Sequence, residues 1–255
     1  MSAYEALAAS YDGLTRDIPY ERILRFWHSL LQRHGKTPHT VLDLACGTGS
    51  LSLLLAQEGY SVLGVDYSEQ MLTVAAGKAM ELQENAPYFV RQAMQRLRLP
   101  QPVDCVLCCL DSLNYLTKPE DCEKTISRVY DALVPGGVFF FDINTPCKLK
   151  ALDGQVFLDE TQDAYCVWRA DYSERENLLR YGMDLFQRQG AMWRRSFEEH
   201  CEYAYAPEQL ARYLSQAGFA EIEQYGDLRH TAPTEQEQRI YFFAVKPEAD
   251  GKEQK

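Results

Sequence analysis

Residues 41–50 read Val-Leu-Asp-Leu-Ala-Cys-Gly-Thr-Gly-Ser, and this stretch decides the fold. An apolar strand carries one acid, Asp43, and breaks into the glycine turn 47–49, which a helical run at 50–57 follows at once. Glycine allows a tight turn and lets a ligand approach where a Cβ would collide. The free amides at the helix start point toward such a ligand. The pattern therefore predicts a nucleoside-cofactor site at the end of this strand.

Size and charge narrow the function classes. A chain of 255 residues can bury a large core as one domain, or as a domain with a substantial insertion. With 26 Lys and Arg against 37 Asp and Glu, the net charge is −11, which argues against a broad nucleic-acid-binding face. The start lacks a secretory signal pattern, and no apolar run reaches membrane-spanning length. We expect a cytoplasmic protein with a small-molecule partner, and the oligomeric state stays open.

Three of the eight cysteines, Cys105, Cys108 and Cys109, lie in the apolar run 103–110 and raise the question of a metal site. Strand alternation puts Cys105 and Cys108 on opposite faces, and no second Cys/His pair has zinc spacing. We therefore expect buried reduced thiols and no metal.

Strand and helix patterns alternate along the first part of the chain. Apolar positions recur at helical spacing over residues 20–34. Strands are then expected at 41–45, 61–65, 88–91, 103–110 and 138–143, and helices at 50–58, 69–82 and 119–133. The last helix should stop at Pro135-Gly136-Gly137. Continuous apolar strands are typical of a parallel sheet that helices cover on both faces. We predict a doubly wound, Rossmann-like α/β fold around a mostly parallel seven-stranded sheet.

The alternation stops after residue 144. Residues 155–205 are rich in aromatic and β-branched residues with long alternating stretches, which predicts an antiparallel insertion of three or four strands. In its last strand, Phe197, Cys201, Tyr203 and Tyr205 share one face, and Arg194, Ser196, Glu198, His200 and Glu202 share the other. A helix at 208–217 and strands at 220–225 and 239–245 should follow. The expected organisation is a cofactor-binding domain at 1–144 and 206–247, a cap at 145–205, and a disordered tail at 248–255.

A dinucleotide cofactor must be weighed against other nucleosides. The spacing Gly47-x-Gly49-x-x-Ser52 places serine where a dinucleotide fold usually has its packing glycine. A carboxylate at Asp43 would repel a pyrophosphate, but it suits a ligand that carries an ammonium and a sulfonium. The chain also ends with a helix and two strands where a second mononucleotide half would be expected. These features disfavour NAD.

With these residues in hand, the chain resembles the class I S-adenosylmethionine-dependent methyltransferases over residues 41–143 and, more weakly, the final strands. The resemblance implies that the methionine part of S-adenosylmethionine is surrounded by Asp43, Ala45, Gly47 and Gly49. It also implies that Asp66, which ends the second strand, binds the ribose hydroxyls. A carboxylate can accept two hydrogen bonds from a vicinal diol.

The resemblance extends to the adenine end of the cofactor. Tyr67 follows the ribose acid, Ser68 can cap the next helix, and Met71 would lie near the adenine plane. Where the family often has an acid that binds the adenine amino group, this chain has Ala93. The contact then falls to the amide of Met94, so we expect rearranged adenine recognition.

The resemblance places further contacts after the fourth strand, at Asp111, Asn114 and Tyr115, and at an N-terminal tyrosine, here Tyr11. No obligatory catalytic residue is expected, because the cofactor is already activated and catalysis needs mostly alignment and water exclusion. Asp111, Asn114 and Tyr115 are the candidates for positioning the acceptor, and Asp111 is a candidate cofactor contact as well.

Several other residues have both a functional and a structural interpretation. His200 and His230 could act as a base, although a lone histidine on a strand or loop more often has a structural role. Trp168 and Tyr181, like Tyr115, either line an acceptor pocket or form the core of the insertion.

The predicted function is methyl transfer from S-adenosylmethionine to an unidentified small molecule held under the cap. Two alternatives remain: a scaffold or sensor that binds the cofactor without methyl transfer, and an NAD(P)-dependent oxidoreductase.

Overall fold

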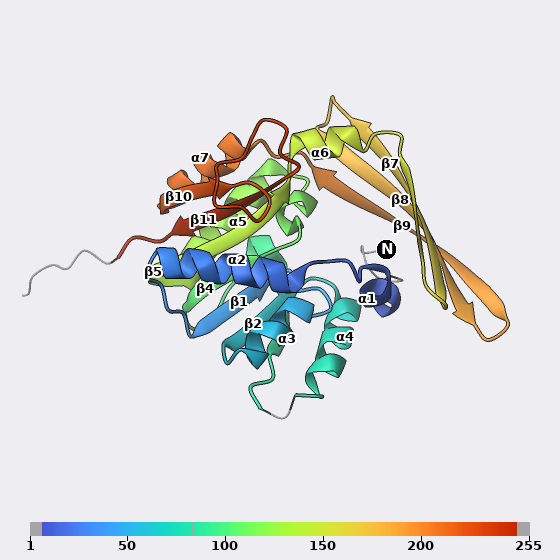
Figure 1. Ribbon diagram of the computed structural model, residues 1–255, viewed down its shortest axis with the longest axis horizontal. Helices are drawn as coiled ribbons and strands as arrows, with labels where there is room; N and C mark the ends of the chain where they lie inside the picture. The colour runs from blue at the N-terminus through green and yellow to red at the C-terminus, as the bar shows by residue number, and fades with distance from the viewer. Residues whose placement is uncertain (1–6, 83, 249–255) are drawn as a thin grey trace, which may run out of the picture.

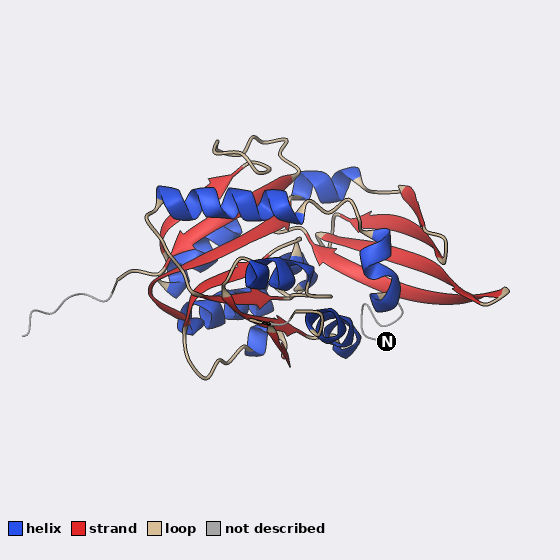
Figure 2. Ribbon diagram, turned by 60° about the horizontal axis from the view of Figure 1, so that its bottom comes forward, coloured by secondary structure: helices blue, strands red, loops and turns tan. Residues whose placement is uncertain are grey.

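The larger of two sheets has seven strands in the order β10-β11-β5-β4-β1-β2-β3 (Figures 1 and 2). The computed structural model describes residues 7–82 and 84–248. β11 runs antiparallel to both of its neighbours, and the other paired strands run parallel, which confirms the predicted mostly parallel sheet. The strands are β1 (Thr40–Leu44), β2 (Ser61–Asp66), β3 (Tyr88–Arg91), β4 (Val103–Cys108), β5 (Leu133–Asn144), β10 (Ala220–Tyr225) and β11 (Arg239–Val245).

Helices cover both faces of this sheet. Val41 of β1 packs into a cluster with α2 and α3, and Leu42 packs into a second cluster with α5 and α7. This two-sided burial is why the strands read as continuous apolar runs. The helices are α1 (Tyr11–Leu14), α2 (Tyr20–Arg33), α3 (Ser50–Gln57), α4 (Glu69–Ala79), α5 (Pro119–Ala132), α6 (Pro146–Ala151) and α7 (Pro207–Ala217). Short 3-10 turns are η1 (Ala8–Ser10), η2 (Met94–Arg96) and η3 (Ser112–Tyr115).

The strand order determines where a ligand can lie. From β1 the chain proceeds to β2 and β3 on one side, and then to β4 and β5 on the other. Open α/β sheets bind ligands outside the carboxyl ends of the strands at such a switch point. The carboxyl ends of β1, β2 and β4 meet there.

The second sheet is a four-stranded antiparallel sheet in the order β6-β7-β8-β9, as predicted for the insertion. It extends away from the main body, with α6 leading into it and α1 beneath it (Figure 1). Its strands are β6 (Val156–Glu160), β7 (Ala164–Ser173), β8 (Leu178–Gln189) and β9 (Met192–Tyr203).

The buried face of β9 is the polar one. Glu198, His200 and Glu202 are almost fully buried, whereas Phe197 on the opposite face is 49% exposed. The predicted alternation is therefore correct, but the main body covers the acids and the histidine. A polar face buried in this way suggests a chemical use.

The structure differs from the predicted elements most clearly at β5 and α6. β5 already begins at Leu133, and Pro135-Gly136-Gly137 lies within it, because Gly136 and Gly137 exchange backbone hydrogen bonds with Lys246 at 3.0 and 2.8 Å. The helix α6 was not predicted; Thr145 caps it by accepting from the Lys148 amide.

Both ends of the chain reach beyond the described residues. Of the expected disordered tail, Glu248 lies 3.7 Å from Lys36, and residues 249–255 are outside the described part. Between residues 7 and 248, residue 83 aside, no helix has the length and apolar character that crossing a membrane requires.

Candidate active site

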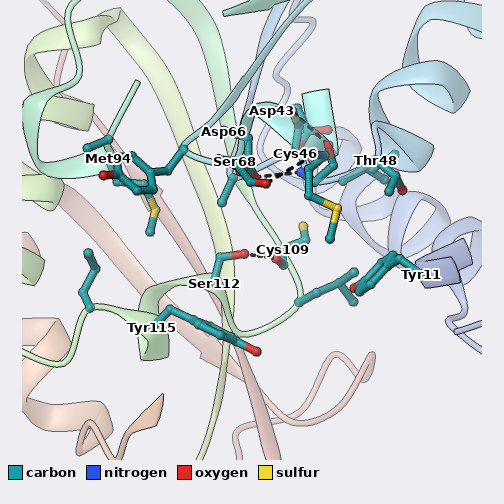
Figure 3. Close-up of a pocket in the computed structure, with 18 of the residues that line it drawn as sticks. Tyr11, Asp43, Cys46, Thr48, Asp66, Ser68, Met94, Cys109, Ser112 and Tyr115 are labelled. Atoms are coloured by element: carbon teal, nitrogen blue, oxygen red, sulfur yellow. Dashed lines mark hydrogen bonds between the residues drawn. The ribbon is translucent and has the colours of Figure 1, made fainter. Parts of the chain in front are cut away.

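A cavity of about 530 Å³ lies at the carboxyl ends of β1, β2 and β4 (Figure 3). The structure brings to its wall most of the residues that the sequence singled out, namely Tyr11, Asp43, Ala45, Gly47, Asp66, Tyr67, Met71, Ala93, Met94 and Tyr115. It also adds residues that sequence reasoning missed, among them Tyr20, Cys46, Gln95 and Arg96. Gly49, Asp111 and Asn114 are not part of this wall.

The glycine turn has two kinds of glycine. Ala45, Gly47 and Gly49 all have positive φ, at 62°, 54° and 74°. A Cβ on Gly47 would meet no atom within 4 Å, so the space beside it is open. A Cβ on Gly49 would lie 2.9 Å from Phe89 and from Ala75, so Gly49 permits close packing of the sheet and α4. The turn therefore opens to the cavity at Gly47, and Gly49 lies behind it.

Asp43 is a buried carboxylate at the base of the cavity. Ser52 Oγ donates to its Oδ2 at 2.5 Å. Burial raises the pKa of Asp43 to about 6, and the Ser52 hydrogen bond opposes the rise. Ser52 stands where a dinucleotide fold usually has its packing glycine. Here it donates a hydrogen bond to Asp43 instead.

Asp66 presents its carboxylate on the next strand. Its Oδ2 accepts from the Gly47 amide at 2.9 Å, and its Oδ1 accepts from the Ser68 amide at 2.8 Å. Burial raises the pKa of Asp66, and these backbone hydrogen bonds oppose the rise. Each oxygen keeps a further lone pair for a ligand. Ser68 caps α4 by accepting from the Met71 amide, as predicted.

The N-terminal segment closes one side of the cavity. Asp12 accepts from Thr48 Oγ1 at 2.6 Å and from Lys78 Nζ at 2.7 Å, so α1 is tied to the glycine turn and to α4. The neighbouring Tyr11 points toward the cavity (Figure 3). Burial, with the nearby Tyr20, raises the pKa of Tyr11, which keeps it a neutral phenol. Tyr11 therefore keeps its phenolic proton at neutral pH.

A strained turn follows β4. Leu110 and Asp111 both have left-handed φ, at 60° and 53°, a conformation that side chains rarely adopt. The Asp142 carboxylate accepts from both of their amides, at 2.7 and 3.0 Å. Arg239 donates to Asp142 and, at 2.6 Å, to Asp111. Such strain persists only where the surroundings enforce it, and it clusters at functional sites.

Two predicted site residues near this turn lie outside the cavity wall. The Asp111 carboxylate is paired with Arg239 behind the cavity wall instead of forming part of it. Asn114 is completely buried, donates to the carbonyls of Asn144 and Tyr203, and accepts from the Asn144 amide. Asn114 therefore joins η3 to β5 and the end of β9, and its side chain is fully used in that contact.

The two candidate histidines differ in their surroundings. His200 Nε2 lies 3.2 Å from Glu198, and its ring meets Tyr115 edge-on at 6.2 Å. His230 lies against Phe26 of α2, at 5.1 Å between ring centroids, and contacts Ser29. His200 is thus next to the cavity wall, and His230 has a packing role elsewhere.

Cys105, Cys108 and Cys109 are buried, as expected. Cys105 and Cys108 belong to the clusters on opposite faces of the sheet, and all eight cysteines are free thiols. No group of three His, Cys, Asp or Glu suited to a metal is present among residues 7–82 and 84–248.

Comparisons with known proteins agree with this geometry. Residues 41–137 match the family described as "Methyltransferase domain". A protein of Geobacillus named as a methyltransferase is 32% identical and covers 95% of this chain and 99% of its own length. A Bacillus subtilis protein named as a methyltransferase, YqeM, is 31% identical and covers 95% of this chain and 97% of its own length.

Solved structures agree as well. A crystal structure of an S-adenosylmethionine-dependent methyltransferase from Clostridium acetobutylicum superposes with a TM-score of 0.85 at 29% identity, covering 96% of this chain and 100% of the other. The CcbJ methyltransferase of Streptomyces caelestis shares the fold, with a TM-score of 0.79 at 20% identity over 95% and 96%. The family excludes the NAD(P)-dependent oxidoreductase alternative. The chain belongs to the class I S-adenosylmethionine-dependent methyltransferases.

Proposed function

We propose that the cavity binds S-adenosylmethionine and that a small-molecule acceptor receives its methyl group beneath the cap. Bound there, S-adenosylmethionine supplies a sulfonium methyl that is already activated toward a nucleophile. The observation that carries the proposal is the pair of carboxylates beside the open turn at Gly47, the buried Asp43 and the half-buried Asp66.

The residues of the wall suit the parts of this cofactor in order. Asp43 and the turn amides fit an ammonium and carboxylate end, and Asp66 fits the ribose diol. Met71, Ala93 and Met94 offer an apolar slot with backbone amides for adenine, where no acid is available. Tyr11 closes the methionine end, where it can exclude water from the sulfonium. We infer that Gly49 and Asp111 act from behind the wall.

The division into a core (1–144 and 206–247) and a cap (145–205) supports a small acceptor. The cap meets the main body at Asn114 and Asn144, near the carboxyl ends of the strands, and the net charge of −11 disfavours nucleic acid. The free cysteines support a reducing, cytoplasmic location. Among more distant relatives are proteins named as ubiquinone biosynthesis O-methyltransferases and glycine N-methyltransferases, so their names divide between oxygen and nitrogen acceptors.

Titration calorimetry with S-adenosylmethionine tests the cofactor site. Asp66→Ala removes the acceptor for the ribose hydroxyls, and a hydrogen bond to a charged group is worth about 1.5–3 kcal/mol, so affinity should fall roughly 10- to 150-fold. Glu69→Ala, which removes an exposed acid nearby on α4, should leave the affinity unchanged. Equal affinity of wild type and Asp66→Ala, or NAD binding in place of S-adenosylmethionine, would overturn the proposal.

A further inference from the structure

Beyond the cofactor cavity, side chains from the cap and from the sheet form a curved series of neighbours. We call it the cap ring. It begins at Tyr115 on the cavity wall and returns to Asp111, four residues earlier in the chain. Its members are Tyr115, His200, Trp168, Tyr181, Glu202, Asn144, Arg239 and Asp111.

One half of the cap ring is aromatic. Tyr115 meets His200 at 6.2 Å between ring centroids, and His200 meets Trp168 at 5.9 Å. Trp168 in turn meets Tyr181 edge-on at 6.2 Å. Tyr115, Trp168 and Tyr181 are only partly buried, so they can contact a ligand. Aromatic faces of this kind attract a cation.

The other half is polar. Tyr181 lies close enough to Glu202 for that charge to raise its pKa, and Glu202 Oε2 accepts from Asn144 Nδ2 at 2.9 Å. Asn144 Oδ1 accepts from Arg239 at 3.0 Å, and Arg239 continues to Asp111 at 2.6 Å. These contacts connect the cap to the strained turn at the cofactor cavity.

The pKa of Glu202, an acid of the cap ring, is shifted by burial and by neighbouring charges. Burial, with the charge of Asp111, raises its pKa to about 8. Asn144, Lys148 and Arg239 oppose the rise, and they come from β5, α6 and β11. Tyr181 from β8 remains a phenol, because burial and Glu202 raise its pKa. Glu202 can therefore take up or release a proton near neutral pH.

We propose, on the basis of the function proposed above, that the cap ring binds the acceptor as an amine and that Glu202 takes up the amine's proton through Tyr181. Protonated amines suit an aromatic wall beside a carboxylate, and a neutral alcohol gains neither contact to the same extent. A carboxyl that titrates near the working pH is suited to proton transfer.

The proton transfer balances in two steps. The ammonium gives one proton to the Tyr181 oxygen while Tyr181 passes its own proton to the Glu202 carboxylate, leaving a free amine and a carboxylic acid. The amine nitrogen then forms a bond to the sulfonium methyl carbon while the carbon–sulfur bond breaks and its electron pair stays on sulfur. The methylated ammonium and the neutral thioether leave, and Glu202 returns its proton to solvent.

Matched probe pairs test this assignment. Ethanolamine is compared with ethylene glycol, cyclohexylamine with cyclohexanol, and benzylamine with benzyl alcohol. S-adenosylmethionine is the methyl donor, and formation of the thioether product is measured between pH 6 and 9. We expect methylation of amines and not of alcohols. The rate should rise with pH through about 8, and this rise should be absent from Glu202→Gln. The rate of that variant should fall about 100-fold.

The controls separate this inference from the cofactor site. Glutamine at position 202 can still accept from Asn144, and Glu199→Gln changes an exposed acid on the other face of β9 and should match wild type. Calorimetry must first show that wild type and Glu202→Gln bind the cofactor with equal affinity. Given that, three results would overturn the inference. These are preferred methylation of the alcohols, no product from any probe, and an unchanged rate and pH profile in Glu202→Gln. Loss of cofactor binding in the wild type would instead overturn the proposed function itself.

Discussion

Replacing Arg239 by glutamine removes the cation that compensates Asp142 beneath the strained turn after β4. The Asp142 side chain has no exposed surface and that of Arg239 is 18% exposed, so water cannot replace the guanidinium. Breaking a buried ion pair by removing one partner costs about 3–5 kcal/mol. At about 2–4 °C per kcal/mol for a chain of this size, the Tm should fall by about 6–20 °C.

The loss should depend on pH in a defined direction. Burial already raises the pKa of Asp142, and the charge of Arg239 opposes that rise. Without Arg239 the pKa of Asp142 rises further, so the folded variant holds a proton that the unfolded chain has released. A folded carboxyl with a raised pKa favours folding at low pH, and this contribution is lost as pH rises through that pKa. The Tm deficit should therefore be small near pH 5 and grow toward pH 8.

Differential scanning calorimetry between pH 5 and 8 measures both effects. The matched control is Arg25→Gln, because Arg25 pairs with Glu21 at 3.3 Å on the surface of α2, with side chains 67% and 78% exposed. Such a pair is worth about 0–1 kcal/mol. Equal deficits in the two variants, or a deficit in Arg239→Gln that does not change with pH, would refute the reasoning.

Three further perturbations address the cofactor cavity. Asp43 is ionised above its pKa of about 6, so wild-type affinity for S-adenosylmethionine should weaken below pH 6, and calorimetry of Asp43→Asn should lack that dependence. Asp12→Asn loses the ion pair with Lys78, which is partly exposed, so the cofactor should dissociate about two- to fivefold faster in stopped-flow measurements; an unchanged rate would exclude a closing role for α1. Gly49→Ala puts a Cβ 2.9 Å from Phe89 at a φ of +74°, so urea unfolding should show a loss of about 1–3 kcal/mol, and an unchanged midpoint would contradict the packing argument.

Much of the fold could be predicted because its signals are local. The glycine turn, the Ser68 cap and the helical spacing of α2 each depend on residues within a few positions of one another. β5 was predicted too short because glycine and proline usually stop an element, whereas here long-range backbone bonds to Lys246 extend the strand. Tertiary pairing outweighed the local signal.

The sequence singled out residues of the cofactor cavity and, on the cap side, Tyr115, Trp168, Tyr181 and His200, but it gave no role to Asn144, Glu202 or Arg239. Asp43 and Asp66 end neighbouring strands close in sequence, so their convergence follows from strand order. Arg239 meets Asp111 across 128 residues, and Glu202 meets Asn144 across 58. Neither pair has a spacing that a sequence pattern could reveal. The one available hint was Asp142, an acid that follows three phenylalanines in a buried strand.

The sequence by itself determined the parallel sheet, the glycine turn and the two acids beside it, because strand, turn and helix are local and their order specifies which ends meet. Only the tertiary structure decided which face of β9 lies inward. Alternation defines two faces of the strand without showing which one is buried. A choice by the number of apolar residues would have placed the face of Phe197 inward. Packing of the cap instead buries Glu198, His200 and Glu202, because each has a polar partner on the inward side. Asn144 donates to Glu202, the Leu7 amide donates to Glu198, and His200 lies 3.2 Å from Glu198.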